Sequence, residues 1–77
     1  MQITEEEKKL IDGLQVGTES EVVKNPFSGD SMELCPEAVA IYDLVKGAEM
    51  LGDYRTVEAG LGIFGRNWPD AYMVLLD

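Results

Sequence analysis

The string in this sequence with the clearest chemical precedent is GLGIFG, where Gly60, Gly62 and Gly65 have the spacing G-x-G-x-x-G. In a dinucleotide-binding turn, such glycines let backbone N–H groups approach a pyrophosphate. That turn follows a strand, opens a helix and has an acidic residue about twenty positions later. Here the string lies inside an amphipathic helical pattern, with too little chain after it. We therefore predict no cofactor, and expect the glycines either to permit close helix packing or to weaken the helix.

Cys35 is the only cysteine, and it stands beside Pro36, close to a predicted helix N-terminus where the helix dipole stabilises a thiolate. The chain contains no histidine, which excludes a Cys-His pair, a Ser-His-Asp triad and a Cys/His zinc site. Fifteen carboxylates are present, but none has the spacing of a calcium loop. The sequence therefore predicts a protein that is not an enzyme, with no catalytic, cofactor-binding or metal site.

The net charge of −9, from 15 acidic and 6 basic residues, is spread along the whole chain. A negative field repels phosphate backbones and anionic lipid, so we expect no direct binding to nucleic acid or to a membrane. It favours a protein partner with a basic surface. Acidity that serves only solubility is the alternative.

Localisation is predicted from cysteine usage and hydropathy. One cysteine cannot form an intramolecular disulfide, which fits a reducing compartment. No apolar run approaches the roughly 18 residues that a membrane span needs. Glu5, Glu6 and Glu7 have the wrong charge for the start of a secretory signal, so we expect a cytoplasmic protein.

The length of 77 residues predicts a single small globular domain, residues 1–77. Thr4 followed by Glu7 is a capping-box pattern, which predicts a short helix over residues 5–14. We expect this acidic helix and the loop after it, residues 1–20, to be the more mobile part of the domain.

A β-hairpin is predicted next, from two short strands over residues 21–24 and 31–34. The turn chemistry lies in NPFSGD between them, since proline fixes φ and glycine permits a positive φ. Val23, Met32 and Leu34 fall on one face of the hairpin because strand side chains alternate. A two-stranded hairpin is marginal alone, so this face must lie against a helix.

Two longer helices follow, over residues 36–51 and 53–68, separated at Gly52 and ended by Pro69. The helical spacing predicts a core face on each; the first consists of Ile41, Leu44, Val45, Ala48 and Leu51, and the second of Tyr54, Val57, Leu61, Phe64 and Trp68. Residues 70–77 read as a short helix or a third strand, and helix is favoured. The predicted fold class is α+β, mostly α: an N-terminal helix, a hairpin, an antiparallel helical hairpin and this last element.

The candidate partner-binding residues lie outside the predicted core. Val39, Tyr42 and Met50 form a second, partly apolar stripe on the helix over residues 36–51, and Lys46 lies on the same side. Phe27 sits in the turn of the hairpin, where an exposed aromatic could anchor a partner. The alternative is that Phe27 folds back onto the hairpin as part of the core.

At NPFSGDSMELCPEAVAIYD, and again at NWPDAYMVLLD, the chain resembles small acidic proteins, mostly uncharacterised, that are encoded by tailed bacteriophages. The resemblance covers residues 22–77. It implies a viral origin and the host bacterial cytosol as the place of action. It carries over no catalytic or binding residue.

Together these features predict a non-catalytic interaction protein that binds or inhibits a host protein. Two alternatives stay open. The first is an acidic mimic that occupies a nucleic-acid-binding cleft of another protein, although evenly scattered acids suit it less well. The second is a structural or assembly protein that acts as a homodimer or larger homo-oligomer.

Overall fold

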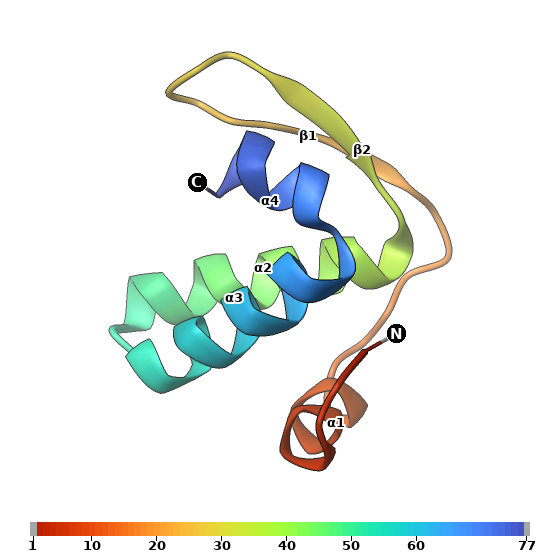
Figure 1. Cartoon of the computed structure of the whole chain (residues 1–77), viewed down its shortest axis with the longest axis vertical. Helices are drawn as coiled ribbons and strands as arrows, with labels where there is room; N and C mark the ends of the chain where they lie inside the picture. Colours follow the sequence, from red (N-terminus) through yellow and green to blue (C-terminus); the bar gives the residue numbers. More distant parts are fainter. Residues whose placement is uncertain (1, 77) are drawn as a thin grey trace.

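The computed structural model describes residues 2–76 and shows an α+β fold that is mostly helical (Figure 1). Four helices and two strands follow in the order α1 (Glu5–Asp12), β1 (Glu21–Lys24), β2 (Ser31–Leu34), α2 (Pro36–Leu51), α3 (Tyr54–Asn67) and α4 (Pro69–Leu75). The fold class predicted from the sequence is confirmed. The segment whose type was open, 70–77, is helical as far as Leu75.

Local sequence signals account for where the helices begin and end. The side chain of Thr4 accepts a hydrogen bond from the N–H of Glu7, and the Glu7 carboxylate accepts one from the N–H of Thr4, so the capping box is present. Pro36 occupies the first turn of α2. Gly52 ends α2 in the left-handed region, with φ of 71°, and its N–H reaches back to carbonyls of the last turn.

The hairpin packs one face onto the helices. The strands are antiparallel, with Val23 opposite Met32 and Val22 opposite Glu33. Val23 and Met32 are partly buried against the core and Leu34 is buried, whereas Val22 and Glu33 are exposed. The face predicted for Val23, Met32 and Leu34 is therefore confirmed, and α4 lies beneath it (Figure 1).

The core lies between α2, α3, α4 and the inner face of the hairpin. The ring of Phe64 is at its centre, 5.4 Å from the ring of Trp68 and 6.4 Å from that of Tyr42, both in tilted arrangements. No polar or charged residue among residues 2–76 is buried. The buried hydrophobic residues are Leu34, Ala38, Ile41, Val45, Ala48, Ile63, Phe64, Ala71 and Leu75.

Close contact between α2 and α3 explains one glycine of GLGIFG. Gly60 is buried, and a β-carbon added to it would lie 2.5 Å from Cγ2 of Val45, closer than two carbon atoms can approach. A β-carbon added to Gly65 would meet the ring of Tyr72 at 3.5 Å, an ordinary contact distance. The close-packing interpretation of the string is thus correct at Gly60, where the absent side chain lets the two helices meet.

The predicted core face of α3 is partly wrong. Phe64 is buried as expected, but Tyr54 is 73% exposed, and Ile63, which the spacing left out, is fully buried. On α2, Leu51 is also wrong, being 85% exposed. Gly60 and Ile63 lie on the inward side of α3, where Gly60 meets Val45 of α2. Beside the tight α2–α3 turn, the rest of residues 2–76 leaves Leu51 and Tyr54 largely uncovered.

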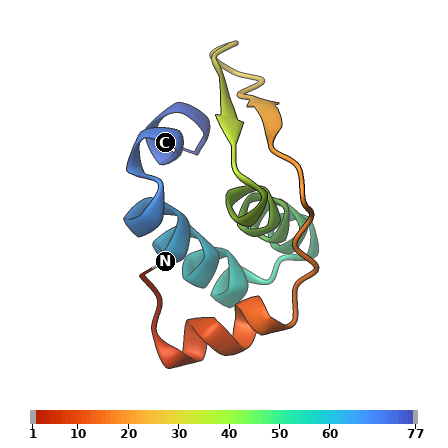
Figure 2. The same cartoon turned by 90° about the vertical axis from the view of Figure 1, so that its right-hand side faces the viewer.

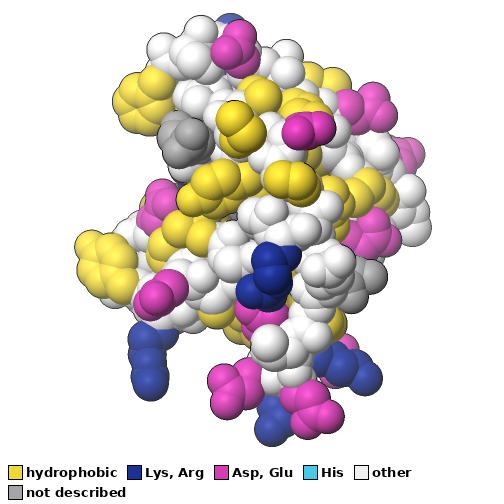
Figure 3. All heavy atoms as spheres, viewed as in Figure 1, with side chains coloured by type: hydrophobic (Ala, Val, Ile, Leu, Met, Phe, Trp, Pro, Cys, Tyr) yellow, Lys and Arg dark blue, Asp and Glu magenta, His cyan; other side chains and the backbone are white. Residues whose placement is uncertain are grey.

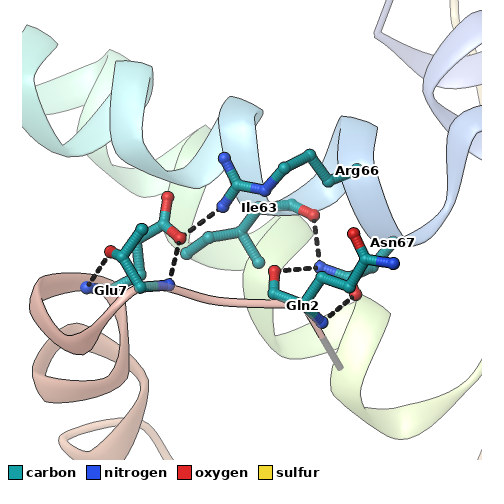
Figure 4. A network of polar contacts seen from close by, with 6 residues as sticks. Gln2, Glu7, Ile63, Arg66 and Asn67 are labelled. Atoms are coloured by element: carbon teal, nitrogen blue, oxygen red, sulfur yellow. Dashed lines mark hydrogen bonds and ion pairs between the residues drawn. The ribbon is translucent and has the colours of Figure 1, made fainter.

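Polar contacts to α3 add to apolar packing in holding α1 (Figures 2 and 4). No residue of α1 is fully buried, but Leu10 and Ile11 are half-buried and pack against the core. Arg66 donates a hydrogen bond to the carboxylate of Glu7, whose side chain is only 13% exposed. The side chain of Asn67 accepts from the N–H of Gln2 at 2.6 Å and donates to its carbonyl at 3.1 Å. The hydrogen bond from Arg66, and then that from Thr4, lower the pKa of Glu7, and the same contact raises the pKa of Arg66. The greater mobility expected of residues 1–20 stays a prediction.

Within residues 2–76, the structure contains no helix that combines the length and the apolar composition needed to cross a membrane.

Alanine substitutions at two glycines test the helix contact. We expect Gly60→Ala to lower the free energy of unfolding by about 1–3 kcal/mol, because the new β-carbon forces α2 and α3 apart. Gly47→Ala is the matched control: its β-carbon meets nothing within 4 Å, so it should raise the free energy of unfolding by up to about 1 kcal/mol through helix propensity. Urea unfolding followed by circular dichroism measures both. Equal effects of the two substitutions on the free energy of unfolding would contradict a close contact between α2 and α3 at Gly60.

The attachment of α1 should depend on pH. Since the folded pKa of Glu7 is lowered, its stabilising contribution is complete above the ordinary glutamate pKa of about 4.3 and is lost as the pH falls through the lowered value. As the pH falls through this range, amide hydrogen exchange should show decreasing protection factors in α1 and unchanged protection factors in α3. Glu7→Gln keeps the capping pattern but removes the charge, so α1 of this variant should be less protected at neutral pH and lack the acid step. An identical acid step in both proteins would refute the role of this ion pair.

Candidate interaction surface

The side chain of Asn25 braces the loop between β1 and β2, and Ser28 adds a further contact by accepting from the N–H of Asp30 at 3.2 Å. The side-chain oxygen of Asn25 accepts hydrogen bonds from the N–H groups of Phe27, at 2.9 Å, and Ser28, at 3.4 Å. Its side-chain nitrogen donates to the carbonyl of Val74 near the end of α4, at 2.9 Å. Asn25 thus closes a local turn and ties that turn to a helix 49 positions along the chain.

Backbone hydrogen bonds complete the loop. The N–H of Asn25 donates to the carbonyl of Asp30 at 2.7 Å, and the N–H of Gly29 donates to the carbonyl of Asn25 at 2.9 Å. Gly29 has φ of 80°, which favours glycine over residues with a side chain. The turn that NPFSGD predicts is therefore present, with proline and glycine at its two ends.

Phe27 projects from this loop and is 98% exposed. The alternative in which Phe27 folds back onto the hairpin is therefore wrong. The ring receives no cover because Asn25 fixes the loop backbone in a closed turn and no other described element reaches it. Figure 3 shows hydrophobic side chains at the loop end of the hairpin, above those at the tip of α2 and α3.

The second stripe of α2 is not a continuous exposed patch. Val39 and Tyr42 are half-buried and pack against the core, so the helical wheel was wrong in placing them on a free surface. Lys46 has its ammonium 5.6 Å from the centre of the Tyr42 ring and 3.7 Å from the carboxylate of Glu49. Of the stripe, only Met50 is open to solvent, at 88%.

The structure instead gathers exposed apolar side chains at the turn between α2 and α3. Met50, Leu51 and Tyr54 are all largely exposed there and lie within five positions of one another. Helical spacing assigned Leu51 and Tyr54 to the core. The signal that could have found them is Gly52, since large side chains next to a tight helix–helix turn lie beyond the reach of the partner helix.

Polar chemistry around these surfaces is simple. The carboxylate of Asp53 caps α3, accepting from the hydroxyl of Thr56 at 2.6 Å and from its N–H at 3.2 Å, and these hydrogen bonds lower the pKa of Asp53. Cys35 stands at the start of α2, half-buried, and its side chain makes no capping hydrogen bond. Residues 2–76 contain no group of three or more Cys, Asp or Glu side chains placed to hold a metal ion. The arrangement presents apolar contacts on a negatively charged body.

Comparison with protein-family models, with curated proteins and with solved structures finds no match to this chain.

Two substitutions in the loop should affect stability to very different extents. Asn25→Ala removes the bond to Val74 and both loop contacts, so we expect it to lower the free energy of unfolding by about 1–2 kcal/mol. Phe27→Ala removes an exposed ring and should change it by less than about 0.5 kcal/mol. Thermal and urea unfolding measure both. A clear destabilisation by Phe27→Ala would show that the ring packs against the protein in solution.

Proposed function

We propose that this chain is a non-catalytic protein-binding protein whose hairpin loop presents Phe27 as an aromatic anchor to a protein partner. The observation that carries the proposal is the exposure of this ring on a loop that is itself fixed. An exposed phenylalanine gives the folded chain no buried area. Aromatic side chains that fill a partner's pocket, in contrast, are among the main contributors to binding energy.

The bracing of the loop supports this function through its effect on entropy. A mobile loop loses backbone freedom when it binds, at a cost of about 1–2 kcal/mol for each residue that becomes ordered. Asn25 holds the backbone on both sides of Phe27 before any partner arrives. The ring is therefore offered from a framework that has already lost much of this freedom.

Charge supports a partner of the opposite sign. The net charge of −9 favours a basic protein surface, which would also associate faster at low salt. Together with the resemblance to phage-encoded proteins, these features support binding or inhibition of a host protein in a bacterial cytosol.

Affinity capture from a bacterial lysate, with the wild-type chain and single variants, tests the role of Phe27. Phe27→Ala should lose the captured protein, reducing affinity about tenfold or more, with an unchanged circular dichroism spectrum. Met73→Ala removes an exposed apolar side chain of α4 and is the matched control, which should keep the partner.

Equal capture by both variants would contradict the proposal. Capture that is unchanged by Phe27→Ala and falls steeply as the salt concentration rises would indicate an acidic mimic instead. Sedimentation that shows a dimer dispersed by Phe27→Ala would indicate a homo-oligomer.

A further inference from the structure

A groove of about 410 Å³ is lined by residues of α1, of α2 and of the turn that leads into α3. Helix α1 lies on the far side of α2 and α3 from the hairpin (Figures 1 and 2). Its apolar lining comes from Leu44 and Leu51 of α2 and from Leu10 of α1. Asp43 and Asp53 line the same groove, and the carboxylate of Asp53 there also accepts the two hydrogen bonds from Thr56. Leu51 is 85% exposed, so the groove opens onto apolar surface that the described part of the chain leaves uncovered.

Gly47, which also lines the groove, is the informative residue. It lies in the interior of α2, where glycine disfavours the helix by about 1 kcal/mol relative to alanine. At Gly60 that cost has an internal reason, since Val45 fills the space of a side chain. At Gly47 no such packing reason exists, because an added β-carbon would meet no atom of the described chain within 4 Å. The missing side chain instead leaves a bare stretch of helix backbone in the groove, where another chain can approach closely.

The chemistry of the groove specifies its occupant. The apolar lining, with no side chain at Gly47, can accept the apolar face of a helix. The negative charges of Asp43 and Asp53 favour lysine or arginine beside that face. We propose that this groove binds a basic amphipathic helix of a protein partner, with Gly47 as the point of closest approach. A second copy of this chain is disfavoured because it would bring another net charge of −9 to the same place.

This surface is separate from the Phe27 loop, and the inference does not rest on the proposed role of that loop. Phe27 extends from the hairpin, whereas the groove is built by α1, α2 and the turn that leads into α3. Either surface can fail its test without affecting the other.

Peptide titration of the full chain tests the proposal. The probe is a fluorescein-labelled peptide of leucine and lysine, about 18 residues or roughly five helical turns long, with its leucines on one face. A peptide of the same composition with scattered leucines controls for charge alone. We expect the amphipathic peptide to bind about tenfold or more tightly than the scrambled one, with the largest amide shift changes at Leu44, Gly47 and Leu51.

Substitutions then locate the contact. Gly47→Gln should weaken binding about tenfold while the free energy of unfolding stays the same or rises, because glutamine favours the helix and projects into the groove. Asp43→Asn should weaken binding by a smaller factor. Glu33→Gln removes one charge from the outer face of the hairpin and should have no effect.

Three results would overturn the proposal: equal binding of the scrambled peptide, unchanged affinity in Gly47→Gln, or shift changes confined to residues outside the groove. A dimer in sedimentation that Gly47→Gln converts to a monomer would overturn it too, since a second copy would then be the occupant.

Discussion

Val45 of α2 lies over Gly60 of α3 so closely that no side chain fits between them, and the rest of the fold follows from this contact. It sets which side of α3 faces inward and thereby buries Ile63 and Phe64. Phe64 in turn packs in tilted contacts against the rings of Tyr42 and Trp68. With α2 and α3 in place, α4, the hairpin and half-buried residues of the N-terminal segment cover the remaining apolar face. Within residues 2–76 the core contains no buried polar side chain.

Much of the fold could be predicted from local chemistry. The capping box at Thr4, the proline that opens α2 and the glycine that ends it are each determined by a few neighbouring residues, and the structure has them as predicted. The side of α3 that faces the core could not be predicted. The prediction used the spacing of apolar side chains, and Gly60, which has no side chain, does not contribute to that spacing. The two helices in fact touch at Gly60. The apolar spacing therefore assigned Tyr54 to the core and left Ile63 out.

The candidate surfaces likewise combine features that local sequence determines with features that only the tertiary fold determines. The loop was found from proline and glycine, but the exposure of Phe27 depends on the tie between Asn25 and α4, which joins distant parts of the sequence. The stripe of Val39 and Tyr42 looked free on an isolated helix, whereas the tertiary fold packs both residues against the core. Three exposed apolar side chains, those of Met50, Leu51 and Tyr54, gather where the chain reverses between α2 and α3. Helical periodicity carries no information about such helix ends.

The hydrogen bond from Asn25 to the carbonyl of Val74 also has a mechanical meaning. It links the start of the hairpin loop to the last helix, so the loop backbone at Asn25 cannot move away from α4 without losing this hydrogen bond. Displacement of the loop is therefore opposed from both ends of residues 25–74.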